Sequence, residues 1–155
     1  MRTIRGFSNN SNHNRITEQT RKTLRRNILN FFEIKNLNQT KFDSYHKKSC
    51  EDLIVAFEDQ LFTIGQAQKW INMTFKYLNL LNYDGIEYVY EYCHVPIDNY
   101  VLNITNYKLD KAWSKLNNYD EYLDFQKLFR NKYKNSIPLD KEFYLWLEEA
   151  KKSKK

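Results

Sequence analysis

The chain contains few of the residues that interrupt regular structure, since only three glycines and two prolines occur among its 155 residues. An all-β domain of this length needs more tight turns than these residues supply, so helices are favoured. The two cysteines, Cys50 and Cys93, are too few for a disulfide-rich secreted scaffold. No apolar run is long enough to span a membrane. We therefore expect a cytoplasmic all-α protein with one core and no membrane partner.

Positive charge is concentrated at the two ends of the chain, whose net charge is +6. Residues 1–26 carry seven Arg or Lys and one acidic residue, and residues 146–155 carry four Lys and two Glu. Arginines at this density neutralise phosphates without reading base sequence, which predicts salt-dependent nucleic-acid binding. A solvated tail and helix face would have the same pattern. A loose basic arm is expected over residues 1–14, followed by the candidate phosphate contacts Arg15, Arg21, Arg25 and Arg26.

Apolar residues recur at helical spacing through most of residues 15–155, which indicates one compact domain of about six to seven helices. Ser49 with Asp52 is typical of a capping box and predicts a helix over about 50–61. Residues 86–93 leave two alternatives open. Alternating tyrosines favour a short extended segment, whereas the spacing of Ile86, Val89 and Tyr90 favours a helix.

The most regular helical pattern covers residues 66–82. Trp70 and Tyr77 share its apolar face, and Lys69 and Asn72 lie on an expected solvent face. The next helix is predicted to start at Asp98, because Pro96 disfavours helical geometry before it and aspartate is a good N-cap.

Lys69 and Asp98 form the best candidate site for chemistry. Lys69 is expected in the first turn of its helix, where unpaired backbone N–H groups and the helix dipole disfavour an ammonium ion. A desolvated amine in that position can act as a nucleophile, and a carboxylate at a helix start can orient it. An ordinary surface lysine and a purely structural cap fit the same pattern.

The residues around this pair resemble a known enzyme family. Gly65, Gln68, Lys69, Asn72, Lys76 and Tyr77, followed by Val95, Pro96, Ile97, Asp98 and Val101, look like the catalytic stretch of helix-hairpin-helix DNA glycosylases. The archaeal 8-oxoguanine glycosylases are the most similar branch. The resemblance implies that Lys69 attacks the sugar carbon of an extruded nucleotide and forms a Schiff base, with assistance from Asp98. Small bacterial proteins of uncharacterised function have a similar stretch.

The substrate-binding candidates that go with this resemblance are Gln68, Asn72, Lys76, His94 and Trp113. No metal and no cofactor is expected, because paired CxxC or HxxxH spacing and glycine-rich phosphate loops are absent. The alternative is a non-catalytic basic helical protein that binds nucleic acid or a protein partner, such as a phage or mobile-element regulator. The expected partner is nucleic acid, with DNA favoured, and the alternative hypothesis also allows a protein partner.

Overall fold

The computed structural model describes residues 11–58 and 61–152. Within these ranges the fold is all-α and contains no strand, which confirms the predicted class. The helices are α1 (Ser11–Phe32), α2 (Gln39–Phe57), α3 (Ile64–Leu80), α4 (Ile86–Tyr90), α5 (Asn99–Thr105), the 3-10 helix η1 (Trp113–Lys115), α6 (Tyr119–Lys132) and α7 (Pro138–Lys152). None of the described helices is long and apolar enough to cross a membrane.

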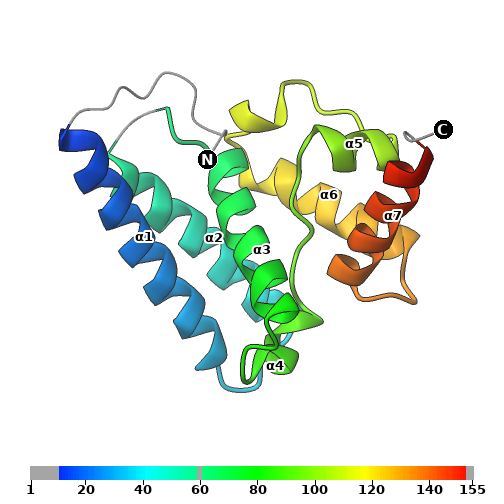
Figure 1. Ribbon diagram of the computed structural model, residues 1–155, viewed down its shortest axis with the longest axis horizontal. Helices are drawn as coiled ribbons and strands as arrows, with labels where there is room; N and C mark the ends of the chain where they lie inside the picture. The colour runs from blue at the N-terminus through cyan, green and yellow to red at the C-terminus, as the bar shows by residue number, and fades with distance from the viewer. Residues whose placement is uncertain (1–10, 59–60, 153–155) are drawn as a thin grey trace.

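Helix α3 lies at the centre of the domain, with α1 and α2 on one side and α5 and α7 on the other (Figure 1). Three buried phenylalanines join the first three helices. The ring centroids of Phe31 and Phe42 are 5.0 Å apart, and those of Phe31 and Phe75 are 5.1 Å apart in an edge-on arrangement. Such aromatic pairs contribute packing energy beyond the area that they bury. The core therefore holds α3 firmly against α1 and α2.

Helix α2 begins at Gln39, so the predicted start near residue 50 was wrong. Asn38 is the N-cap, and its side chain accepts a hydrogen bond of 3.0 Å from the backbone N–H of Lys41. Ser49 lies inside the helix and is buried. The early turns were missed because the buried stripe of α2 includes the polar residues His46 and Ser49, which interrupt its apolar periodicity.

The buried face of α3 also differs from the prediction. Ile71, Asn72 and Phe75 are fully buried, whereas Tyr77 is 56% exposed. The expected solvent face therefore contains core positions. The prediction was wrong because it assigned polar residues to solvent, whereas buried amide side chains are stable where their hydrogen bonds are satisfied inside the protein.

One expected segment boundary is corrected, and one of the two alternatives left open by the sequence is confirmed. Helix α1 begins at Ser11, so residues 11–14 are helical rather than part of a loose arm; residues 1–10 lie outside the described residues. Adding residues to the end of a helix that has already formed costs much less free energy than starting one, so polar residues 11–14 can continue α1. Residues 86–90 form α4 and not an extended segment, with Ile86, Val89 and Tyr90 buried at helical spacing. Gly85 supplies the left-handed turn before α4, with φ of 79°.

Candidate functional site

Lys69 and Asp98 meet in the folded chain although 29 residues separate them. The amine Nζ of Lys69 donates to Oδ2 of Asp98 at 3.0 Å, and the two side chains are 23% and 27% exposed. Asp98 is the N-cap of α5, and its other oxygen accepts from the backbone N–H of Val101 at 2.9 Å. The predicted cap is therefore confirmed. The backbone N–H of Val101 holds one oxygen of the Asp98 carboxylate, and the other oxygen faces the Lys69 amine.

The position of Lys69 along α3 is one turn later than predicted. The helix begins at Ile64, so Lys69 is in the second turn and beyond the unpaired N–H groups. The helix dipole acts mainly within the first turn, so it contributes less to this amine than the sequence indicated. The local environment is set instead by the side chains around the amine.

Trp113 covers a second side of the Lys69 amine. Nζ lies 4.8 Å from the centroid of the indole ring, in the geometry of a cation–π contact. The partly buried tryptophan belongs to η1, which lies directly against the start of α3. The backbone N–H of Gly65 donates to the Leu116 carbonyl at 2.9 Å, and a Cβ on Gly65 would lie 1.8 Å from the Trp113 carbonyl oxygen. Glycine is therefore required for this close approach.

Gln68 holds the segment that carries Asp98. Its side-chain Nε2 donates to the Ile97 carbonyl at 3.0 Å, and its Oε1 accepts from the Ile97 N–H at 3.1 Å. Nε2 also donates to the carbonyl of Gly65 at 2.8 Å. Because Gln68 precedes Lys69 and Ile97 precedes Asp98, this amide pairing holds the side chains of Lys69 and Asp98 next to each other. Gln68 is fully buried and hydrogen-bonded within the protein, and its substrate contact stays a prediction.

Asn72 continues this buried polar network into the core. Its Nδ2 donates to Gln68 at 3.0 Å and to the Tyr122 hydroxyl at 2.9 Å, and contacts the Val95 carbonyl at 3.3 Å. Its Oδ1 accepts from Nε2 of His46 at 2.9 Å. The side chain is fully buried. Asn72 is thus the central connection between α3, α2, α6 and the loop before Asp98.

His94 belongs to a series of hydrogen-bonded side chains that runs from the buried Tyr122 to the partly exposed Asp43. Its Nε2 donates to the Asp43 carboxylate at 2.9 Å, and its Nδ1 accepts from the Tyr122 hydroxyl at 2.8 Å. Burial lowers the pKa of His94, and the hydrogen bond to Asp43 opposes that change. Burial disfavours ionisation of Asp43, but the hydrogen bonds from His94 and Gln39 and the positive charge of Arg130 together outweigh burial and lower the pKa of Asp43. This arrangement matches a neutral imidazole beside an ionised carboxylate.

Lys76 forms a second ion pair two turns after Lys69 on the same side of α3. Its Nζ lies 2.5 Å from Oε2 of Glu142 in α7, and the side chains are 14% and 5% exposed. The amine also lies 5.3 Å from the ring centroid of Phe143. Burial raises the pKa of Glu142, and Lys76 partly opposes that effect. Lys76 therefore joins α3 to α7 in this structure.

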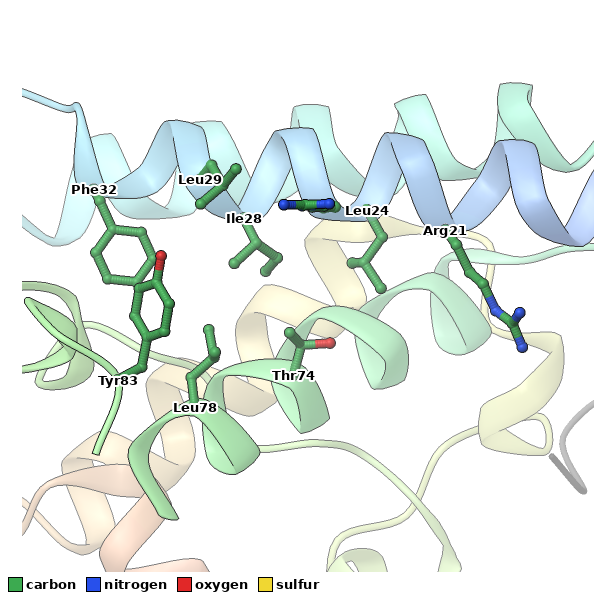
Figure 2. A pocket seen from close by; sticks show the side chains of 9 residues that line it. Arg21, Leu24, Ile28, Leu29, Phe32, Thr74, Leu78 and Tyr83 are labelled. Atoms are coloured by element: carbon green, nitrogen blue, oxygen red, sulfur yellow. The ribbon is translucent and has the colours of Figure 1, made fainter. Parts of the chain in front are cut away.

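The arginines of α1 are not brought to Lys69. Arg15 pairs with Glu58 of the α2 C-cap at 2.7 Å, and both side chains are largely exposed. Arg21, Arg25 and Arg26 are exposed as well. Helix α1 packs on the side of α3 that carries Thr74 and Leu78 (Figure 2), whereas Lys69 faces α5 and η1. Phosphate contacts through α1 and chemistry at Lys69 would thus use different faces.

Sequence reasoning missed His46, Tyr122, Asp43 and Glu142 as members of these clusters. For His46 a signal existed, because it is spaced one helical turn from Phe42 and from Cys50. Nothing in the sequence indicated that the Tyr122 hydroxyl meets Asn72. Glu142 had no signal that distinguished it from a surface carboxylate.

Among the residues that the structure describes, no group of three or more His, Cys, Asp or Glu could hold a metal ion. Cys50 and Cys93 are both buried thiols. No protein-family model, curated protein or solved structure matches this chain. A function must therefore be inferred from the site itself and from the resemblance of its sequence.

Proposed function

We propose that this protein is a DNA glycosylase or abasic-site lyase that uses Lys69 as the nucleophile and Asp98 as its proton acceptor. The observation that carries the proposal is the 3.0 Å contact between two partly exposed side chains, Lys69 in the second turn of α3 and Asp98 at the start of α5. The resemblance to helix-hairpin-helix glycosylases independently assigns chemistry to the same two residues. A converging amine and carboxylate is the arrangement that such chemistry requires.

The proposed reaction begins with a proton transfer. An ammonium ion has no lone pair, so the proton on Lys69 passes first to Asp98, which is within hydrogen-bond reach. The free amine then attacks C1′ of an extruded nucleotide, and the base leaves with the electron pair of the glycosidic bond and takes up a proton. The nitrogen then loses a proton and its lone pair breaks the C1′–O4′ bond, which gives a protonated Schiff base on Lys69 and, after O4′ takes up a proton, a hydroxyl at C4′ of the opened sugar. Trp113 offers an aromatic surface beside the amine on which a base can stack.

Borohydride trapping on DNA that contains an abasic site tests this proposal. The aldehyde form of the sugar condenses with a lysine amine and loses water, and hydride reduces the resulting imine to a stable amine. We expect a covalent complex with the natural protein and none with Lys69→Arg. Arginine keeps the positive charge needed for the contacts with Asp98 and Trp113, but its guanidinium stays protonated and forms no such imine.

The matched control is Lys47→Arg, because Lys47 is also a lysine near an aromatic ring, with Nζ 5.8 Å from the Tyr119 centroid. This variant should trap as much DNA as the natural protein. Equal trapping by Lys69→Arg would remove Lys69 as the nucleophile. Thermal unfolding of each variant, followed by circular dichroism, checks that the comparison is made between folded proteins.

A second candidate function, nucleic-acid binding without catalysis, is favoured by the exposed face of α1. Within the described residues Arg21, Arg25 and Arg26 form no ion pair. Replacing all three by glutamine should reduce the slope of log affinity for duplex DNA against log salt by roughly 0.9 for each phosphate that the protein no longer neutralises. Lys69→Arg should leave that slope unchanged. A slope unaffected by the triple substitution would exclude α1 from DNA binding; filter binding over a salt series measures it.

A further inference from the structure

An apolar groove lies between α1 and α3, on the side of α3 away from Lys69. Figure 2 shows it from close by, with Leu24 and Ile28 from α1 facing Thr74 and Leu78 from α3. Its volume is about 340 Å³. Small-molecule sites start at about 300 Å³, so the groove is at the lower end of that range. Two basic residues, Arg21 and Arg25, also line it.

The groove has a different chemical character at each end. Phe32 and Tyr83 lie together at one end, with ring centroids 5.4 Å apart, and Arg21 lies at the other end in Figure 2. Along α1, Arg21 and Phe32 are separated by about 16 Å, at about 1.5 Å per helical residue. An occupant that matches this lining is apolar over most of its length and anionic at one end.

The two guanidinium groups are open to an anion. Arg21 and Arg25 are exposed and form no ion pair within the described part of the chain. On the same helix Arg15 does pair with an acid, Glu58. An arginine fork binds a carboxylate through two parallel hydrogen bonds, and such charge-assisted bonds are stronger than neutral ones. The apolar lining is open too, since Leu29 is 42% exposed and Tyr83 is 41% exposed.

We propose that this groove binds a free single-chain carboxylate of the medium-chain fatty acid class. The acyl chain lies along Leu24, Ile28 and Leu78 toward the Phe32 and Tyr83 rings, and the carboxylate meets Arg21 and Arg25. A thin chain suits the volume. A partner helix about 10 Å across and as long as the groove would occupy several times that space.

The groove is separate from the site of the proposed enzyme activity. Leu78 follows Lys69 by nine residues, which places it on the opposite side of α3 at about 100° of rotation per residue. Changes to the groove lining therefore leave Lys69 and Asp98 in place. Failure of fatty-acid binding would say nothing about Schiff-base formation, and the reverse also holds.

Calorimetric titration of the full chain with decanoate tests the proposal. We expect saturable binding to one site, and weakening by about tenfold to a hundredfold for decanol or for the Arg21→Gln, Arg25→Gln double variant, because the charge-assisted hydrogen bonds are lost. The matched control, Arg26→Gln, changes an exposed arginine outside the groove lining and should bind decanoate as the natural protein does. A second variant, Leu29→Asp, places a negative charge on the exposed rim and should also weaken binding.

Methyl NMR spectra locate the ligand. Decanoate should shift the signals of Leu24, Ile28, Leu29 and Leu78. Shifts centred on the surroundings of Lys69, or equal affinity for decanol and decanoate, would overturn the proposal. The proposal would also be contradicted if the protein bound anionic phospholipid vesicles and decanoate did not reduce that binding. It would likewise be contradicted if the chain self-associated and the Leu29→Asp variant abolished the self-association.

Discussion

Asn72→Leu protein is expected to lose about 4 kcal/mol of its free energy of unfolding. The amide of Asn72 is fully buried and connects four groups: His46, Gln68, Val95 and Tyr122. Leucine removes these partners, and each buried polar group left unsatisfied costs about 1–3 kcal/mol. Relaxation of neighbouring groups makes the total smaller than the sum. Urea unfolding followed by circular dichroism measures the change.

The control for this substitution is Asn79→Leu on the same helix. Asn79 is partly exposed, and its replacement should change the free energy of unfolding by no more than about 0.5 kcal/mol. A loss below about 1 kcal/mol for Asn72→Leu would contradict the central role of its amide. The same network positions the candidate site, because Asn72 donates to Gln68, and Gln68 holds the backbone beside Asp98. Stability and site geometry therefore depend on shared hydrogen bonds.

Local features of the site were predictable from the sequence. The start of α5 at Asp98 is predicted by Pro96, which disfavours helical geometry before it, and by the Asp98 side chain, which caps the nearby backbone N–H groups. The all-α class follows from the scarcity of glycine and proline together with helical periodicity. In both cases the determining interactions lie within a few residues of one another.

The buried polar network was not predictable, because its partners are distant in the sequence. Asn72 meets His46 from 26 residues away and Tyr122 from 50 residues away. A polar residue on an amphipathic helix is usually exposed, so periodicity assigned Asn72 to solvent. Only the packing of α2, α3 and α6 shows that it lies in the core. Lys69 and Asp98 were paired from their expected helix positions and from the resemblance, but no local rule shows that residues so far apart in the chain make contact.

Acidification is expected to destabilise the protein between about pH 6.5 and 5, by about 2 kcal/mol from His46 and by a further amount from His94. His46 is fully buried, and its pKa is held well below the usual value by burial and by the nearby His94, whose ring centroid is 4.7 Å away. An unfolded histidine has a pKa of about 6.5, so below that pH the unfolded chain binds more protons. The stability that His46 contributes by staying neutral in the folded protein is therefore fully present above about pH 6.5 and declines as the pH falls.

The groups that face the two imidazoles determine the shape of this pH dependence. His46 faces Tyr119, Tyr122 and Cys50, whose pKa values burial raises, so they stay neutral across this range. His94 faces Asp43, and the charge of Arg130 also lowers its pKa. The lowered pKa of Asp43 extends the loss of stability below about pH 4.

His46→Gln provides the comparison that isolates the histidine effect. Glutamine does not titrate, so the variant should lose about 1.4 kcal/mol less stability per pH unit than the natural protein below about pH 6.5. Glu142 acts in the opposite direction, because a carboxyl with a raised pKa in the folded state favours folding as the pH falls; this contribution is common to both proteins. Urea unfolding at several pH values between about 7.5 and 5 measures both slopes. Parallel slopes for the two proteins would show that His46 is not a neutral buried group.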